Sequence, residues 1–349
     1  MPDFLRYPAM KTRLLHLLAV AILGAPGAVL TAATPATPVT PVTLTREFDR
    51  VRVEIGGALF TQYVFADGAS RPYLHPILAR DGTPLTRDFP MKETPGEDTD
   101  HPWHRSFWFA HSMMNGIDFW NEGTGDNARS PKEKGRSEHT ILLETTSGPV
   151  GVIRARNRWV APDFRTICHD ERTLRFHAGP DGNFVDFEIT IQALPDKPLH
   201  FGDNKDGTMA LRVAQWMTMP HKMQGKETGG KGRIVTSTGH RDDDAWGKRA
   251  PWADYHAEHN GKVYGIAIFD HPQNLRHPTW WMARGYGLFG ANPFGWHDYE
   301  KEFANDPHKG DHTVPAGGSL TLRYRFYFHN GDEMAAKLAA RYAEYAAGK

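Results

Sequence analysis

Short segments in which apolar and polar side chains alternate recur along the chain, and they limit the possible folds more than any other feature. Successive side chains of a β-strand point to opposite faces of a sheet, so each such segment has one apolar and one polar face. The alternating segments are residues 48–55, 59–65, 140–144, 150–160, 166–177, 184–192, 209–217, 263–269 and 320–328. Strands with one polar face are typical of antiparallel sheets that cover a shared core. The sequence therefore predicts an all-β protein, built as a large two-sheet antiparallel β-sandwich.

One helix is predicted, at the end of the chain. Apolar residues recur there at helical spacing among alanines: Met334, Leu338, Tyr342 and Tyr345. The spacing predicts an amphipathic helix over residues 333–347 that covers one of the sheets. No repeat of about 20 to 50 residues is present, which disfavours propellers and solenoids. We expect one large domain over residues 44–349 rather than two small ones.

Residues 1–33 have the pattern of a secretory signal peptide. Two basic residues precede an apolar run over residues 14–23, and small residues follow as far as Ala33. The run is interrupted by a histidine and is shorter than the roughly 20 apolar residues that a membrane-spanning helix needs. We expect cleavage near Ala33, a Pro/Thr-rich linker over residues 34–43, and a periplasmic or secreted protein. An uncleaved anchor helix is the alternative interpretation.

Charge and cysteine content exclude several classes of function. The chain has 41 Lys and Arg residues against 41 Asp and Glu residues, with no basic stripe long enough to follow a phosphate backbone, so we expect no nucleic-acid partner. The mean hydropathy of −0.55 predicts no membrane span after signal cleavage. Cys168 is the only cysteine, so an intramolecular disulfide is impossible, and its strand-like surroundings predict a buried side chain rather than a nucleophile.

The densest group of residues able to do chemistry lies in residues 100–120. It contains His101, Trp103, His104, Arg105, Trp108 and His111. Histidine both donates and accepts hydrogen bonds near neutral pH, which suits proton transfer at a sugar oxygen or metal ligation. Tryptophan rings suit the apolar face of a pyranose. In the alternative interpretation, residues 107–109 form a core strand and the histidines satisfy buried backbone groups.

Three further groups lie in segments without periodicity, where loops over a β scaffold often carry function. Their candidate residues are Asp203, Lys205, Trp246, Lys248, Arg249, His271 and Asn292. The turn at 201–207 aims an acid and an ammonium in one direction, or is a plain exposed turn. Residues 246–255 bring tryptophans and cations together for a ligand, or as a cation–π contact under a loop. In residues 269–297, proline after histidine presents the imidazole on extended backbone, where it can face a pocket or end a strand.

Taken together, these motifs resemble the PmoA-like family of bacterial proteins over about residues 45–332. The motifs are Asp-His-Pro-Trp-His-Arg at 100–105, Phe-Trp-Phe-Ala-His at 107–111, Gly-Asp-Asn-Lys-Asp at 202–206, Trp-Gly-Lys-Arg-Ala-Pro-Trp at 246–252, Phe-Asp-His-Pro at 269–272 and Gly-Leu-Phe-Gly-Ala-Asn-Pro-Phe at 287–294. The family shares a label with a membrane copper subunit, but this chain lacks the spanning helices of such a subunit. Trp103 stands where the resemblance implies a further histidine, which argues against a three-histidine metal site. By analogy, a galactose-mutarotase-like supersandwich fits the strand count.

The leading hypothesis is an exported carbohydrate-active enzyme that acts on a small sugar or glycoside by histidine acid/base chemistry, without a cofactor. Mutarotation, lyase chemistry and hydrolysis all remain open. The catalytic candidates are His104, His111, Asp203 and His271, and the substrate-binding candidates are His101, Arg105, Trp108, Lys205, Trp246, Lys248, Arg249 and Asn292. Two alternatives stand beside the enzyme: a non-catalytic sugar-binding or cell-surface module, and a protein with a metal ion held by histidines.

Overall fold

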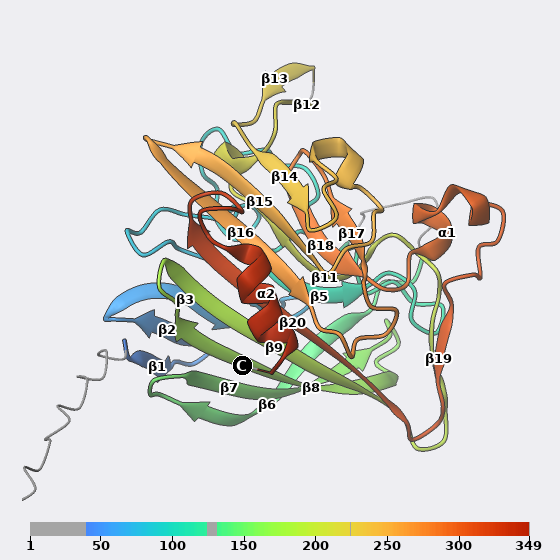
Figure 1. Ribbon diagram of the computed structural model, residues 1–349. Coiled ribbons are helices and arrows are strands. Elements are labelled where there is room, and N and C mark those ends of the chain that lie inside the picture. Colours follow the sequence, from blue (N-terminus) through green and yellow to red (C-terminus); the bar gives the residue numbers. More distant parts are fainter. Residues whose placement is uncertain (1–39, 124–130, 224, 349) are drawn as a thin grey trace, which may run out of the picture. The chain divides into compact units, whose positions relative to one another are not determined.

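The computed structural model describes residues 40–123, 131–223 and 225–348 of the 349-residue chain (Figure 1). The predicted signal peptide and most of the predicted linker lie outside these residues. The described residues all belong to one compact unit.

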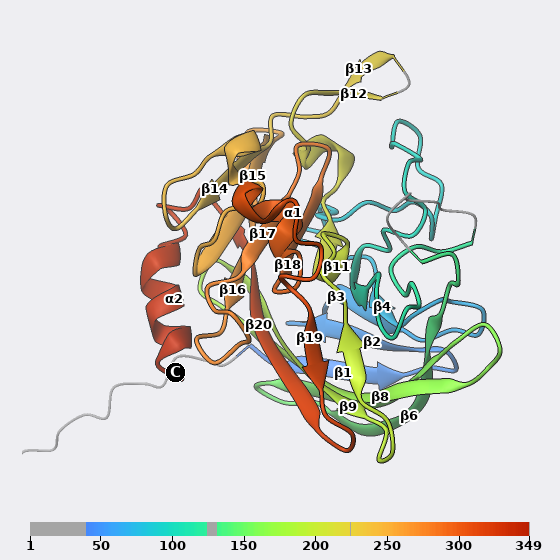
Figure 2. The ribbon, with the colours of Figure 1, turned by 90° about the vertical axis from the view of Figure 1, so that its right-hand side faces the viewer.

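Two eight-stranded antiparallel sheets make up most of this unit (Figures 1 and 2). Sheet A runs in the order β1 (Val42–Arg46), β2 (Arg50–Ile55), β3 (Ala58–Val64), β4 (Tyr73–Leu74), β5 (Phe107–His111), β11 (Gly207–Arg212), β18 (Leu288–Asn292) and β17 (Trp280–Ala283). Sheet B runs in the order β14 (Arg233–Thr236), β15 (Trp252–His259), β16 (Lys262–Asp270), β20 (Ser319–Asn330), β9 (Gly182–Ala193), β8 (Thr166–Ala178), β7 (Gly151–Val160) and β6 (Arg136–Thr146). The predicted all-β, two-sheet antiparallel architecture is confirmed.

Smaller elements connect and extend the sheets. They are the strand pairs β10 (Leu199–Phe201) with β19 (His312–Val314) and β12 (His221–Met223) with β13 (Lys226–Thr228), the helices α1 (Trp296–Tyr299) and α2 (Leu338–Ala346), and the 3₁₀ turns η1 (Gln215–Met217), η2 (Asp242–Ala245) and η3 (Lys301–Phe303).

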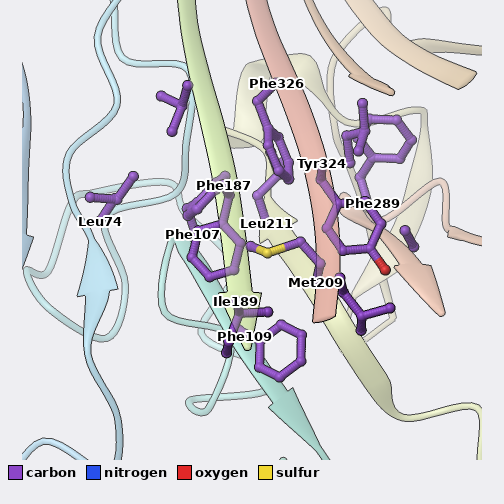
Figure 3. Close-up of a cluster of buried hydrophobic side chains, with 14 of the residues drawn as sticks. Leu74, Phe107, Phe109, Phe187, Ile189, Met209, Leu211, Phe289, Tyr324 and Phe326 are labelled. Atoms are coloured by element: carbon purple, nitrogen blue, oxygen red, sulfur yellow. The ribbon is translucent and has the colours of Figure 1, made fainter. Parts of the chain in front are cut away.

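The inner faces of the two sheets share one hydrophobic core (Figure 3). Phe107 and Phe109 of β5 point into it, and the ring of Phe107 meets the ring of Phe326 from β20 edge to face, with 4.4 Å between centroids. Burying each such side chain contributes about 1.5–3 kcal/mol to folding. Because alternation sends residues 107 and 109 inward, it sends Trp108 and Ala110 to the outer face of sheet A.

Most predicted strands appear within a few residues of their expected bounds. The segment predicted over residues 209–217 is shorter, since β11 ends at Arg212 and η1 follows at Gln215–Met217. Strands β5, β11, β17 and β18 are buried on both faces, so every residue in them is buried and their sequences do not alternate.

The C-terminal helix is present but begins later than residue 333. Lys337 has φ 54°, a left-handed conformation that a helix interior does not tolerate, and α2 starts at the next residue. Leu338 and Tyr345 of α2 pack on Phe269 and Tyr327, which lie on the outer face of sheet B (Figure 1). The helix therefore covers one sheet, as predicted.

Within the described residues, no helix has the length and apolar character that crossing a membrane requires. Cys168 is fully buried and unpaired, and burial raises the pKa of its thiol well above the usual value. It is a core side chain, as expected.

Candidate functional site on the outer face of sheet A

The outer face of sheet A carries a second buried cluster, separate from the core between the sheets. Its members, here called the outer cluster, are Trp108, Ala110, Trp120, Ala210, Met282 and Leu288. Four partly exposed aromatic residues pack against it: Tyr73, Trp103, Trp246 and Tyr286. Aromatic rings that have one buried face and one exposed edge are typical of surfaces that bind ligands. This face therefore gathers the rings that the sequence scatters over more than 200 positions.

The rings of four residues stack into a column on the outer face of sheet A: Tyr286, His101, His104 and Trp108. His101 stacks on Tyr286 on one side, with 5.3 Å between centroids, and on His104 on the other, with 4.7 Å. His104 stacks in turn on Trp108 at 5.1 Å. The guanidinium of Arg212 lies 4.6 Å from the centre of the Tyr286 ring. The column fixes both imidazoles in orientation, because neither ring can turn without losing its neighbours.

Asp100 anchors the column from the side. Its carboxylate accepts hydrogen bonds from Arg87 at 2.6 Å, from Arg212 at 2.7 Å and from Nδ1 of His101. Burial alone would raise the pKa of Asp100, but the hydrogen bond from His101 and the two guanidinium charges hold it well below its usual value. An ionised carboxylate only accepts, so Nδ1 of His101 must carry the proton. In the neutral imidazole, Nε2 of His101 is then the acceptor, on a side chain that is 38% exposed.

His104 differs from His101 in its burial and in which ring nitrogen carries the proton. Its side chain is almost fully buried, and its Nδ1 accepts a hydrogen bond from Arg212 at 3.2 Å. Burial, followed by the charge of Arg212, lowers the pKa of His104 well below 6.5. His104 is therefore neutral, with Nε2–H as its donor, and it suits the stabilisation of an oxygen better than the uptake of a proton.

Charged groups surround Tyr286 from several elements. Burial raises the pKa of Tyr286 to about 12, and Arg212, Arg284, Asp100 and Asp206 all act on it electrostatically. The guanidinium of Arg284 lies 3.2 Å from the centre of the Trp246 ring. Trp246 and the guanidinium of Arg284 therefore lie beside the column, next to Tyr286.

The turn before β11 supplies a further cation to this region. Lys205 pairs with Asp206 at 2.7 Å and is partly exposed. Asn292, which is fully buried, donates to the carbonyl oxygens of Asn204 at 2.9 Å and Lys205 at 3.0 Å. Asn292 thus positions the turn and does not contact solvent.

Arg105 lies at the edge of the outer cluster. It donates to both carboxylate oxygens of Glu122, at 2.9 and 2.7 Å, and its guanidinium lies 5.6 Å from the centre of the Tyr73 ring. The buried Arg71 approaches the same carboxylate at 3.4 Å. Arg105 is held in place by this network.

Three of the predicted catalytic residues lie elsewhere. His111 points to the inner side of sheet A and is fully buried, its Nε2 lies 2.8 Å from the carbonyl oxygen of Gly202, and burial lowers its pKa to about 4. Asp203 is buried and accepts from the backbone N–H groups of Gly310 and His297, and burial raises its pKa. His271 lines a cavity on sheet B.

Two of the predicted binding residues are also outside the column. Lys248 is 41% exposed and approaches Asp244 at 3.5 Å. Arg249 lies over the ring of Trp280 at 4.5 Å and donates to two backbone carbonyls, so the cation–π contact under a loop is its observed role. The structure thus brings together His101, His104, Arg105, Trp108 and Trp246 around the outer cluster. Lys205 is linked to this region through its ion pair with Asp206, which acts electrostatically on Tyr286.

Sequence reasoning missed the residues that set the protonation of the histidines. Arg212 is the last residue of β11, in a segment that was predicted as a strand. A single cation among its apolar residues was the one available signal that Arg212 has a particular role. Arg284 and Tyr286 lie in the segment 269–297 that the sequence had singled out, although neither was chosen as a site residue, and Arg87 comes from a distant segment with no local signal. Asp100 precedes His101 directly and was visible as its neighbour.

A possible metal group lies on sheet B rather than at the column. Within the described ranges, Asp254, His256 and Glu333 form the one group of three side chains whose ligand atoms lie within 4.8 Å of one another. Asp254 is already bonded to His256 at 2.7 Å and to His329 at 3.0 Å, and Glu333 to Arg241 at 3.0 Å. These groups satisfy one another as ion pairs.

These observations define a two-sheet antiparallel β protein with an aromatic and charged site on the outer face of one sheet. The chain belongs to DUF6807, a family of unknown function, whose model matches residues 50–343. This match corrects the PmoA-like resemblance, which was wrong: the motifs quoted for it all lie within the matched range. Short motifs of histidine, tryptophan and glycine are too common to fix a family by themselves. No curated protein matches the sequence.

Several solved structures are similar to this chain. A putative aldose 1-epimerase from Escherichia coli K12 is 9% identical, with 83% of this chain and 98% of that chain covered and a TM-score of 0.35. A galactose mutarotase related enzyme from Lactobacillus acidophilus is 8% identical, with 82% and 97% covered and a TM-score of 0.33. A polysaccharide lyase is 11% identical, with 85% of this chain and 34% of the lyase covered and a TM-score of 0.33. The chain thus spans about a third of the lyase, and likenesses at this level do not assign an activity.

Proposed function

We propose that the protein is a carbohydrate-active enzyme that binds a sugar on the outer face of sheet A and uses the Asp100–His101 pair for proton transfer. One observation carries the proposal. His101 is fixed between Tyr286 and His104, its Nδ1 is held by an ionised carboxylate, and in the neutral imidazole Nε2 is an acceptor on a partly exposed side chain. A histidine oriented by a carboxylate is the usual form of a general base.

The binding part of the proposal rests on the rim of the outer cluster. Trp103, Trp246 and Tyr286 are partly exposed rings that suit the apolar face of a pyranose. Lys205 and Arg284 supply donors for hydroxyl oxygens beside those rings. Trp108 is buried beneath His104, so in this proposal it supports the column from below and the exposed rings make the stacking contact.

The proton transfer is balanced within the column. Nε2 of His101 takes a proton from a sugar hydroxyl or a water molecule, so an O–H bond breaks and an N–H bond forms. Asp100 stabilises the resulting imidazolium, and Nε2–H of His104 donates to the oxygen that gains negative charge. The proton returns from His101 to the product. Mutarotation and hydrolysis each need such a transfer, whereas in lyase chemistry Nε2 would take the proton from a carbon of the sugar and a C–H bond would break.

A non-catalytic sugar-binding module is the second candidate. The observation that favours it is the neutral, almost fully buried His104, which exchanges no proton near pH 7. Such a module needs the exposed rings and would retain its function without an acceptor at His101.

The test compares His101→Asn with Trp246→Ala and with the matched control His271→Asn, which alters a partly exposed histidine on sheet B. Sugars that bind the wild-type protein are identified on a glycan array, and their conversion is followed by NMR. We expect His101→Asn to keep binding but to lose turnover by about 100-fold or more, as for removal of a general base. Trp246→Ala should weaken binding, and His271→Asn should match the wild type. Full turnover by His101→Asn would refute the role of His101 as general base, whereas binding without any turnover by the wild type would refute the enzyme and favour the module.

A further inference from the structure

We infer that the sugar bound at the column is one unit of an oligosaccharide, and that a neutral neighbouring unit occupies a second cavity at the end of β11. This inference rests on the proposed function and deepens it. The cavity has a volume of about 420 Å³, within the range of small-molecule sites. Its lining includes Pro84, Pro95, Glu97, Trp216, Thr228 and His259.

An aromatic wall gives this cavity the character of a sugar site. The indole N–H of Trp216 donates to the carbonyl oxygen of Pro84 at 2.9 Å, and the ring lies 4.5 Å from the ring of His259. Trp216 is only partly buried although it packs on the core. A ring fixed at its N–H edge, with prolines beside it, offers a rigid apolar surface that needs no reordering when a ligand binds.

Two short connections join the cavity to the column. Arg87 donates both to the carbonyl oxygen of Asp98 at 3.1 Å and to the side chain of Asp100 at 2.6 Å. The carboxylate of Asp98 in turn accepts from Gln215, a lining residue, at 3.0 Å. Gln215 is also three residues beyond Arg212, a span of at most about 11 Å for extended chain. The two sites are therefore close enough in the fold for an oligosaccharide of a few units to span them.

The charges of the lining select the kind of sugar. Asp88 and Glu97 contribute carboxylates, and the lining residues, all of them within the described chain, include neither lysine nor arginine. Asp88 is paired with Lys92 at 3.0 Å, but Lys92 points to solvent and is 68% exposed. A uronate or a sulfated sugar would bring a further negative charge beside these carboxylates, and no lysine or arginine of the lining would pair with it. The cavity therefore suits a neutral sugar.

The test measures affinity as a function of chain length. Neutral oligosaccharides from one to six units, built on the sugar that binds the wild-type protein, are titrated by calorimetry beside uronate-containing oligosaccharides of equal length. We expect wild-type affinity to rise from the monosaccharide to the longer chains, and uronates to bind more weakly. Trp216→Ala should lose roughly threefold to tenfold for the longer chains, the worth of one aromatic contact, and nothing for the monosaccharide.

Matched variants separate this effect from loss of folding. Trp216→Phe keeps an aromatic face and should retain the gain with length, and Phe164→Ala, which removes a ring that is 70% exposed outside the cavity lining, should behave as the wild type. His259→Ala should show the same length-specific loss and tests the cavity if Trp216→Ala does not fold. Equal wild-type affinity for all lengths, an equal loss for all lengths in the variants, or tight uronate binding would overturn this inference. Binding of no sugar at all would instead overturn the proposed function.

Discussion

Replacing Asp100 by asparagine should destabilise the protein strongly, although the two side chains have the same shape. Asp100 is the shared acceptor of Arg87 and Arg212, whose side chains are 0% and 1% exposed. The substitution removes the negative charge and leaves two buried guanidinium groups without their counter-ion. Loss of one partner of a buried ion pair costs about 3–5 kcal/mol.

The expected shift in Tm follows from the size of the folded unit. For about 310 residues, the unfolding entropy near 60 °C is about 0.6 kcal/mol/K, so a loss of about 3–5 kcal/mol lowers Tm by about 5–8 °C. Because the pKa of Asp100 is depressed in the folded state, this stabilisation is present above the unfolded value of about 3.9 and is lost as pH falls toward the folded value. The difference between the two proteins should therefore be full at pH 7 and shrink below about pH 4.

Differential scanning calorimetry at pH 7 and at pH 3 measures the shift in Tm and its dependence on pH. The control is Asp163→Asn, which removes the partner of an exposed ion pair with Arg165 and should leave Tm unchanged. An Asp100→Asn protein that melts within about 1 °C of the wild type at pH 7 would contradict the assignment of Asp100 as the anchor of the column.

Three further predictions concern other parts of the molecule. Burial opposes the charge on His256, but the hydrogen bond and charge of Asp254 outweigh it and raise the pKa of His256, so the stability it contributes is full below about pH 6.5 and is lost as pH rises. Chemical denaturation should show a larger loss for His256→Gln at pH 6 than at pH 9, and equal losses would contradict this. Asn292→Ala should cost about 1–3 kcal/mol and weaken sugar binding, because it frees the carbonyl groups of the Lys205 turn; unchanged affinity would show that the turn does not serve the site. Mass spectrometry of the protein recovered from the periplasm or medium should show a mature chain that begins near residue 34, whereas a chain that retains residues 1–33 would support the anchor helix.

The sequence predicted one sheet better than the other, for a physical reason. Strands β6 to β9 and β20 have a face that is wholly or partly open to solvent, so their polar and apolar residues alternate. Strands β17 and β18 are covered on both faces and carry no such pattern. The start of α2 was misplaced because Lys337 adopts a left-handed conformation that the spacing of apolar residues does not reveal.

The candidate site was predictable only where its residues are neighbours in the chain. His101, His104 and Trp108 fall in one segment, and the structure stacks them. The alternation of β5 would have separated His111 from Trp108, since residues 107, 109 and 111 share the inner face. The contact of Arg212 with His104 depends on the pairing of β5 with β11, which joins residues about 100 positions apart. No local pattern encodes that pairing.

The central claim is that a sugar binds over the column on the outer face of sheet A. A crystal structure of the protein with a saturating concentration of a sugar that binds in solution tests it most directly. We expect a sugar ring against Trp103, Trp246 or Tyr286, with one of its oxygens within hydrogen-bond distance of Nε2 of His101. A sugar bound instead in the cavity beside His271 on sheet B, with the column unoccupied, would contradict it.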